Sequence, residues 1–329
     1  MSTNSQILTL SLARKRALSL SLVGKQASSL LHDLPAEIII HILELALLHD
    51  RPRDLASISQ IIRHFINIII YRTVVLDTSH TITLFHRTAS SPRSSHLLEH
   101  VRRLAITWEP EYFNATTEKQ LRGIVAQCPS LRAVAVPSCY QVNISPSGAL
   151  LHDGPTDLTV QSFEDLNPDP LSSAVFLLPI YFSTSLTHLR ICEPADKWQS
   201  PLSIIAALHG APNLTHLELA RRTDSNEDND AIFVEDLAYL LTTRKELRMV
   251  VVSIFGGSMR TSLDALRESS IWMLVSKLQE VDSRVVITQG EPGSWREEWK
   301  DVKGFRCGRR PANFWDTVQE RGSQEMVVE

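Results

Sequence analysis

The chain has few of the residues that would place it among disulfide-stabilised, zinc-binding or membrane proteins. It contains four cysteines, Cys128, Cys139, Cys192 and Cys307, which are too scattered for a zinc framework and too few for a disulfide scaffold. Reduced thiols are therefore expected, as in a cytoplasmic or nuclear protein. No apolar run reaches the roughly 18 residues that a membrane span needs, so no membrane contact is predicted.

Basic charge is not in excess either. The chain has 33 lysines and arginines against 37 aspartates and glutamates, a formal net charge of −4. Nucleic-acid-binding proteins usually carry a basic stripe. The charge balance therefore argues against a nucleic-acid partner.

The common catalytic and cofactor motifs are missing as well. There is no nucleophile elbow, no phosphate-binding glycine loop and no zinc helix with two histidines. Gly256-Gly257-Ser258 lacks the lysine of a phosphate loop, and the acidic stretch 223–230 lacks the glycine and closing glutamate of a calcium loop. We therefore predict no catalytic residue, no cofactor and no metal; an enzyme with an unrecognised site is a further alternative.

The most informative stretch is the apolar segment 31–76. A helix is predicted to begin near Asp33-Leu34-Pro35 and to continue through Leu48, because it is capped, starts with proline and is apolar over most of its circumference. The proline-bearing turn 49–54 ends it, and Asp54 is expected to cap a second helix. Such a helical hairpin has more apolar surface than one partner covers, although it would also serve as a plain domain core.

The residues of this hairpin resemble an F-box, the module that docks a substrate receptor onto the Skp-type adaptor of a cullin–RING ubiquitin ligase. Leu34-Pro35-x-Glu37-Ile38 followed by Ile42-Leu43 matches the first half of the motif. In the second half, Ile62 and Phe65 replace the usual cysteine and tryptophan. The resemblance implies adaptor contacts by Leu34, Pro35, Glu37, Ile38, Ile42, Leu43, Leu55, Ile58, Ile61 and Phe65.

A strand pattern, apolar-x-x-apolar-x-apolar, recurs along the rest of the chain. Its first residues lie about 30 residues apart, with one step of about twice that length. The pattern occurs at 71–76, 101–106, 131–136, 186–191, 214–219 and 247–252, and 158–160 and 285–287 are candidates for further strands. A period near 30 is typical of a leucine-rich-type solenoid; the alternative is an ordinary α/β domain.

Helices are expected to connect these strands at 118–127, 171–182, 202–209 and 234–241, with a longer helix at 262–281. Two junctions, Cys128-Pro129-Ser130-Leu131 and Ala211-Pro212-Asn213-Leu214, resemble the leucine-rich family. The asparagine or cysteine expected after each strand appears only as Cys139. The predicted fold class is therefore α/β: an N-terminal F-box hairpin followed by an irregular leucine-rich-repeat-like solenoid of parallel strands and helices.

Side chains between the apolar anchors are expected to project from an exposed face of the sheet, where equivalent positions of adjacent strands stack. His188 and His216 share one such position, and Arg190 and Glu218 share the next. We predict an exposed ion pair between Arg190 and Glu218. With Arg103, these side chains form the candidate target-facing surface, although a solvated face without a ligand is an equally good interpretation.

The ends of the chain differ in composition from the rest. Residues 1–30 are basic and serine-rich and are expected to form a mobile tail, and residues 291–329 contain tryptophans that would cap the solenoid. The predicted domains are thus 1–30 tail, 31–70 F-box, 71–290 repeats and 291–329 cap. This layout resembles that of many fungal F-box proteins and implies a non-enzymatic substrate-recognition subunit of an SCF-type ubiquitin ligase, cytoplasmic or nuclear, with an unknown protein target. The alternative is an adaptor-independent interaction scaffold.

Overall fold

The computed structural model of this protein describes residues 34–109, 115–138, 155–163, 184–208, 210–257, 262–303 and 314–325. Residues 1–30 and the helix expected at 171–182 lie outside these ranges. The chain forms two compact units that divide between Ile70 and Tyr71. We call them the hairpin unit and the sheet unit.

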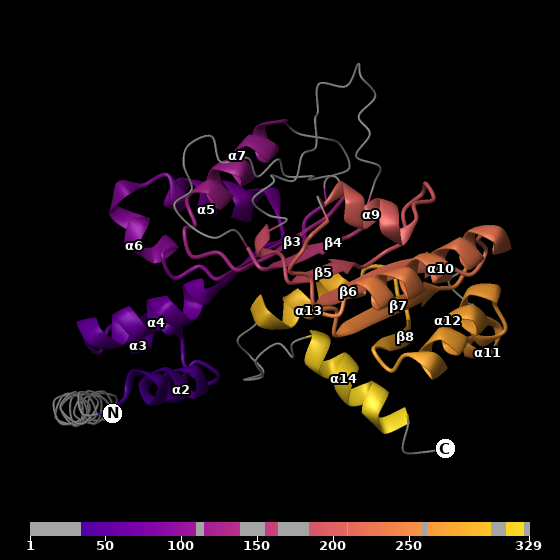
Figure 1. The fold of residues 1–329 in the computed structure, drawn as a ribbon. Helices are drawn as coiled ribbons and strands as arrows, with labels where there is room; N and C mark the ends of the chain where they lie inside the picture. The colour runs from indigo at the N-terminus through magenta and orange to yellow at the C-terminus, as the bar shows by residue number, and fades with distance from the viewer. Residues whose placement is uncertain are drawn as a thin grey trace, which may run out of the picture. The chain divides into compact units, whose positions relative to one another are not determined.

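The described residues of the hairpin unit form three helices: α2 (Ala36–Ala46), α3 (Pro52–Ala56) and the first part of α4 (Gln60–Arg72) (Figure 1). The core between α2 and α4 consists of Ile39, Leu43, Leu47, Ile62, Ile66 and Ile69. Both helices place these residues three to four positions apart, so each buries one stripe against the other.

The sequence predicts one continuous second helix in the hairpin, and this is wrong. The segment forms two helices, α3 and α4. Pro52 rather than Asp54 begins α3, because proline needs no amide partner in the first turn. The Ser59 hydroxyl then accepts a hydrogen bond from the Ile62 amide at 3.1 Å and starts α4. Helical structure also continues to Arg72, so the strand predicted from Tyr71 begins two residues later, at Thr73.

The sheet unit contains one eight-stranded parallel sheet whose strands are ordered as in the sequence, from β1 to β8. The strands are β1 (Thr73–Leu76), β2 (Arg103–Ile106), β3 (Ala133–Val136), β4 (Asp157–Val160), β5 (His188–Ile191), β6 (His216–Arg222), β7 (Met249–Phe255) and β8 (Val285–Gln289). The predicted α/β class and all eight predicted strand positions, including the two further candidates, are confirmed.

The middle apolar anchors of the strand pattern align across the whole sheet. They form one row of paired positions: Val74, Leu104, Val134, Leu158, Leu189, Leu217, Val250 and Val285. Most of these side chains are buried in one continuous hydrophobic core. The repeated pattern therefore fixes the register, since a shift by one residue would turn every anchor to the other face.

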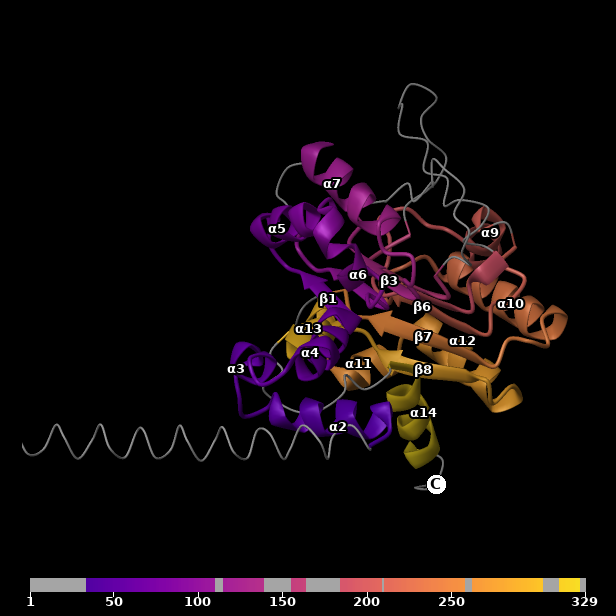
Figure 2. The same ribbon diagram turned by 90° about the vertical axis from the view of Figure 1, so that its left-hand side faces the viewer.

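Helices cover the anchor face of the sheet, as Figure 1 and Figure 2 show for α5, α7 and α9. The elements between the strands are α5 (Ser79–Ala89), η1 (Pro92–Ser94), α6 (Ser95–Leu98), α7 (Ala115–Ala126), α9 (Pro201–Ala207), α10 (Glu227–Thr243), α11 (Leu263–Arg267) and α12 (Ser270–Val281). The single helix predicted over 262–281 is wrong: Ser269 caps Trp272 and starts a second helix.

The other face of the sheet is covered by the C-terminal segment, which contributes α13 (Ser294–Lys303) and α14 (Phe314–Glu325) (Figure 2). The turn from β8 into α13 requires glycine at two places. A Cβ at Gly290 would clash with the Phe255 ring, and Gly293 has a φ of 76°. The C-terminal tryptophans were expected to cap the end of the solenoid. Those at 295, 299 and 315 pack on the face of the sheet instead.

Candidate functional site

The hairpin unit carries exposed apolar side chains along α2 and where α3 meets α4, which together we call the apolar ridge. Its members are between 38% and 51% exposed: Leu34, Ile38, Ile42, Leu45, Ile58 and Ile61. Ile38, Ile42 and Leu45 lie three or four residues apart and form an apolar stripe along α2, and soluble proteins rarely leave contiguous apolar surface uncovered unless it meets a partner. The ridge is therefore the first candidate functional site.

The geometry of α2 explains why the ridge exists. Ile38 and Ile42 lie four residues apart on one side, whereas Ile39 and Leu43 lie on the side that packs against α4. The helix is thus apolar on two sides, and the described residues of the hairpin provide a partner for only one of them.

The residues expected to contact an adaptor fall into two groups. Leu34, Ile38, Ile42, Ile58 and Ile61 belong to the ridge, and Pro35 and Glu37 are also exposed. Leu43 is 5% exposed, while Leu55 and Phe65 are half-buried against the hairpin core. Leu43, which was expected to contact an adaptor, is therefore not accessible, because its side chain fills the contact between α2 and α4.

The second candidate site is the covered face of the sheet, where the predicted ion pair between Arg190 and Glu218 is confirmed. Arg190 Nε donates to Glu218 Oε2 at 2.6 Å. The expected exposure is wrong, since Arg190 is 7% and Glu218 4% exposed. Arg190 also pairs with Glu298 of α13, at 2.8 and 3.1 Å, and its guanidinium carbon lies 3.5 Å from the centre of the Phe314 ring.

The two histidines of the predicted surface lie side by side as expected. The rings of His188 and His216 stack with their centres 4.3 Å apart, and Trp315 of α14 packs against both at 5.6 and 5.2 Å. His188 Nδ1 lies 2.9 Å from Asp157 Oδ1. Burial and the neighbouring His188 lower the pKa of His216 to about 4, so its imidazole is neutral at pH 7.

Arg103, the remaining predicted surface residue, lies on the same face beneath α13. Its guanidinium carbon is 4.7 Å from the Trp299 ring centre, and burial lowers the pKa of Arg103. The C-terminal helices thus contact Arg103, His188, Arg190, His216 and Glu218 directly or through a shared partner. Sequence reasoning expected positions 105 and 135 to be exposed. Both hold alanine, Ala105 and Ala135, and these small side chains were the missed signal that another element covers this face.

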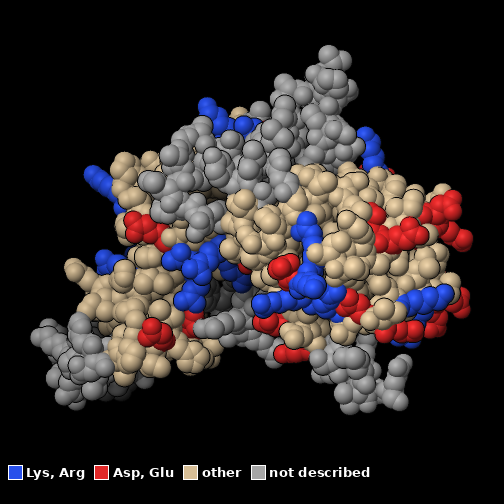
Figure 3. Space-filling model, viewed as in Figure 1, with Lys and Arg blue, Asp and Glu red and all other residues tan. Residues whose placement is uncertain are grey.

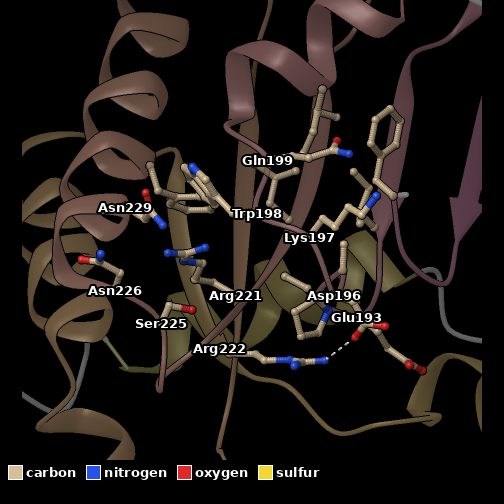
Figure 4. Close-up of a pocket in the computed structure, with 18 of the residues that line it drawn as sticks. Glu193, Asp196, Lys197, Trp198, Gln199, Arg221, Arg222, Ser225, Asn226 and Asn229 are labelled. Carbon is tan, nitrogen blue, oxygen red and sulfur yellow. Dashed lines mark hydrogen bonds and ion pairs between the residues drawn. The ribbon is translucent and has the colours of Figure 1, made fainter. Parts of the chain in front are cut away.

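A pocket of about 290 Å³ opens at the carboxyl ends of β5 and β6 (Figure 4). Buried Arg221 lies 4.3 Å from the Trp198 ring centre and pairs with Asp230 at 2.8 Å, and Arg222 pairs with Asp196 at 3.3 Å. Burial raises the pKa of Asp230, and Arg221 opposes that shift. The pairing is incomplete, because Arg221 Nη2, Asp230 Oδ2 and Gln199 Nε2 are buried without a hydrogen-bond partner within the described ranges. Neither histidine nor cysteine is among the described residues that line the pocket.

Two further properties bear on ligand class. Within the part of the chain that the structure describes, no group of three or more His, Cys, Asp or Glu side chains is arranged to hold a metal ion. The described helices also include none with the length and apolar character needed to cross a bilayer. Figure 3 shows lysine and arginine side chains in small clusters on the face in view, with acidic and uncharged residues between the clusters.

Comparison of the chain with protein-family models, with curated proteins and with solved structures finds no match.

Proposed function

We propose that this protein is a substrate-recognition subunit of an SCF-type cullin–RING ubiquitin ligase. The hairpin unit docks onto a Skp-type adaptor, and the sheet unit, a degenerate leucine-rich-repeat-like solenoid, holds a protein target. The observation that carries the proposal is the apolar ridge, because five of its residues are those for which the F-box resemblance implies adaptor contacts.

The order of the sheet supports the repeat interpretation. Each strand pairs in parallel with its neighbour in the sequence, at the same register and with a helix between most pairs. A solenoid built from repeats of about 30 residues requires this arrangement. The role of the chain is then to bind rather than to react: holding a target near a ubiquitin-charged enzyme raises the effective concentration of the target's lysines.

The ridge residues Ile38 and Ile42 provide the test of adaptor docking. Interface anchors commonly cost about 2 kcal/mol or more when truncated, roughly a thirtyfold loss of affinity. We expect the double variant Ile38→Ala/Ile42→Ala to bind a purified Skp-type adaptor at least thirtyfold more weakly than the wild type in isothermal titration. The thermal midpoint should stay nearly unchanged, because both side chains are substantially exposed.

Matched controls separate docking from folding. Ile39→Ala truncates a buried residue of the same helix and should lower the free energy of unfolding by about 2–5 kcal/mol. Met273→Ala truncates an exposed apolar side chain of the sheet unit and should leave adaptor affinity unchanged. Wild-type protein that does not bind the adaptor, or ridge variants that bind as well as wild type, would favour the adaptor-independent scaffold.

A further inference from the structure

The helix α13 presents a compact recognition face to the sheet. Trp295, Glu298 and Trp299 are spaced three and four residues apart and therefore lie on one side of the helix. Both tryptophans are buried, at 1% and 5% exposure, and the Glu298 carboxylate binds Arg190 through two hydrogen bonds. Two aromatic rings and a carboxylate thus carry the contact.

The sheet has a complementary notch beneath this helix. Ala105, Ala135 and Cys192 form a cluster with the two tryptophan rings, and all three have small side chains that leave space for an indole. At the edge of the notch, Glu193 Oε1 accepts hydrogen bonds from the Gly293 amide at 2.9 Å and from Trp295 Nε1 at 3.2 Å. The face is shaped and charged for an aromatic, acidic helix.

The face can also be uncovered without leaving a buried charge unpaired. Arg190 has a second carboxylate partner within the sheet, Glu218, which in turn accepts a hydrogen bond from the Ser253 hydroxyl at 2.8 Å. If α13 leaves, Arg190 keeps this neutralising partner, and mostly small side chains become exposed in the notch. A helix of 10 residues is marginal on its own, so α13 is held by these tertiary contacts.

We propose that the covered face of the sheet is a helix-binding site, and that α13 is an intramolecular occupant that a partner helix replaces. The partner helix carries two aromatic side chains four residues apart and a carboxylate on the same side. Under the proposed ligase function this helix belongs to the target, and α13 keeps the receptor closed until the target competes for Arg190 and the alanine notch.

A labelled peptide with the sequence of residues 291–303 tests the exchange by fluorescence anisotropy. In the wild-type chain α13 competes at the millimolar effective concentration typical of a tethered segment, so the peptide should bind weakly. In the full-length variant Trp295→Ala/Trp299→Ala the occupant is weakened, and we expect the peptide to bind at least tenfold more tightly. Binding no tighter than to the wild type would overturn the proposal.

The peptide itself supplies the matched control. Glu298→Lys in the peptide removes the partner of Arg190 and should weaken binding to the tryptophan variant at least tenfold. Glu291→Lys makes the same charge change on an exposed residue of the peptide that precedes the helix, and should have little effect. Equal loss for the two peptides would contradict recognition through Arg190.

Hydrogen exchange of the unmodified protein tests the same idea without any substitution. We expect the amides of α13 to exchange through a local opening, well before those of β5 and β6. Exchange of α13 only together with those strands would show that the helix is a fixed part of the core and would overturn the proposal. Adaptor titration of the same sample reports separately on the proposed ligase function.

Discussion

Arg190 shows how a charged side chain is accommodated on a covered sheet face. Its guanidinium has two carboxylate partners and an aromatic ring, and the Ser253 hydroxyl binds the second oxygen of Glu218. A buried charge requires such a complete set of partners, because desolvation alone costs several kcal/mol per ion. The pairing of Arg190 with Glu218 was predictable from strand register, whereas the second carboxylate partner, Glu298, lies more than a hundred residues away in the sequence.

His216 makes the folding stability of the protein depend on pH. Burial, His188 and Arg248 lower the pKa of His216 to about 4, while Asp157 and Asp316 oppose the shift, and the imidazole packs against Trp315. Between pH 6.5 and 4 the unfolded chain therefore binds more protons at this site than the folded chain does. The stability contributed by neutral His216 is complete above pH 6.5 and is lost as the pH falls towards 4.

Chemical denaturation at pH 7 and pH 5 tests this dependence. We expect wild type to lose more stability between the two pH values than the variant His216→Gln, which cannot be protonated there. The difference between the two losses removes the contribution of the carboxylates, because these titrate in both proteins. Equal losses for wild type and variant would contradict a depressed pKa at His216.

Among the elements, α2 determines what the hairpin unit can bind. Its sequence was apolar over most of the circumference, and the structure divides those residues into a side packed on α4 and an exposed side. The division follows from helical period alone, so the exposed positions were accessible to sequence reasoning. The break between α3 and α4 was not, because Ser59 becomes a cap only where the chain turns, and Ile58 and Ile61 looked like one continuous helix.

The packing of α13 against β3 can be tested by enlarging one small side chain. Ala135 is fully buried under the tryptophan cluster, so Ala135→Leu adds three carbons where no space exists. Such overpacking typically costs about 1–3 kcal/mol. We expect a lower thermal midpoint and faster amide exchange in α13.

The neighbouring position Ala133 provides the control for this substitution. It lies on the same face of the same strand but is only half-buried. Ala133→Leu should therefore change the thermal midpoint and the exchange of α13 much less than Ala135→Leu does. Similar effects at the two positions would mean that α13 does not depend on the alanine notch.

For the molecule as a whole, the repeated strand pattern predicted the sheet because each anchor serves the same purpose in every strand. Burial against the helices selects an apolar residue at each anchor position, and parallel pairing aligns those positions. The cover formed by α13 and α14 was not predicted. No periodic signal joins the tail to the strands, and alanine at Ala105 and Ala135 indicates space without indicating what fills it.

The two candidate surfaces belong to different units and have opposite character. The apolar ridge of the hairpin unit is exposed and offers only shape and apolar area, whereas the covered face of the sheet unit combines charge with aromatic rings. A receptor needs these two kinds of surface: one for a constant adaptor and one for a selected target. Both surfaces are required for the proposed ligase role.

Hydrogen exchange of the full-length protein with and without a purified Skp-type adaptor tests the docking claim most directly. We expect the adaptor to slow exchange in α2 and around Ile58 and Ile61, with β5 and β6 unchanged. Protection should be strongest at the amides of the ridge, because burial of these side chains excludes water from the adjoining backbone. Unchanged exchange in α2 at saturating adaptor would contradict docking through the apolar ridge.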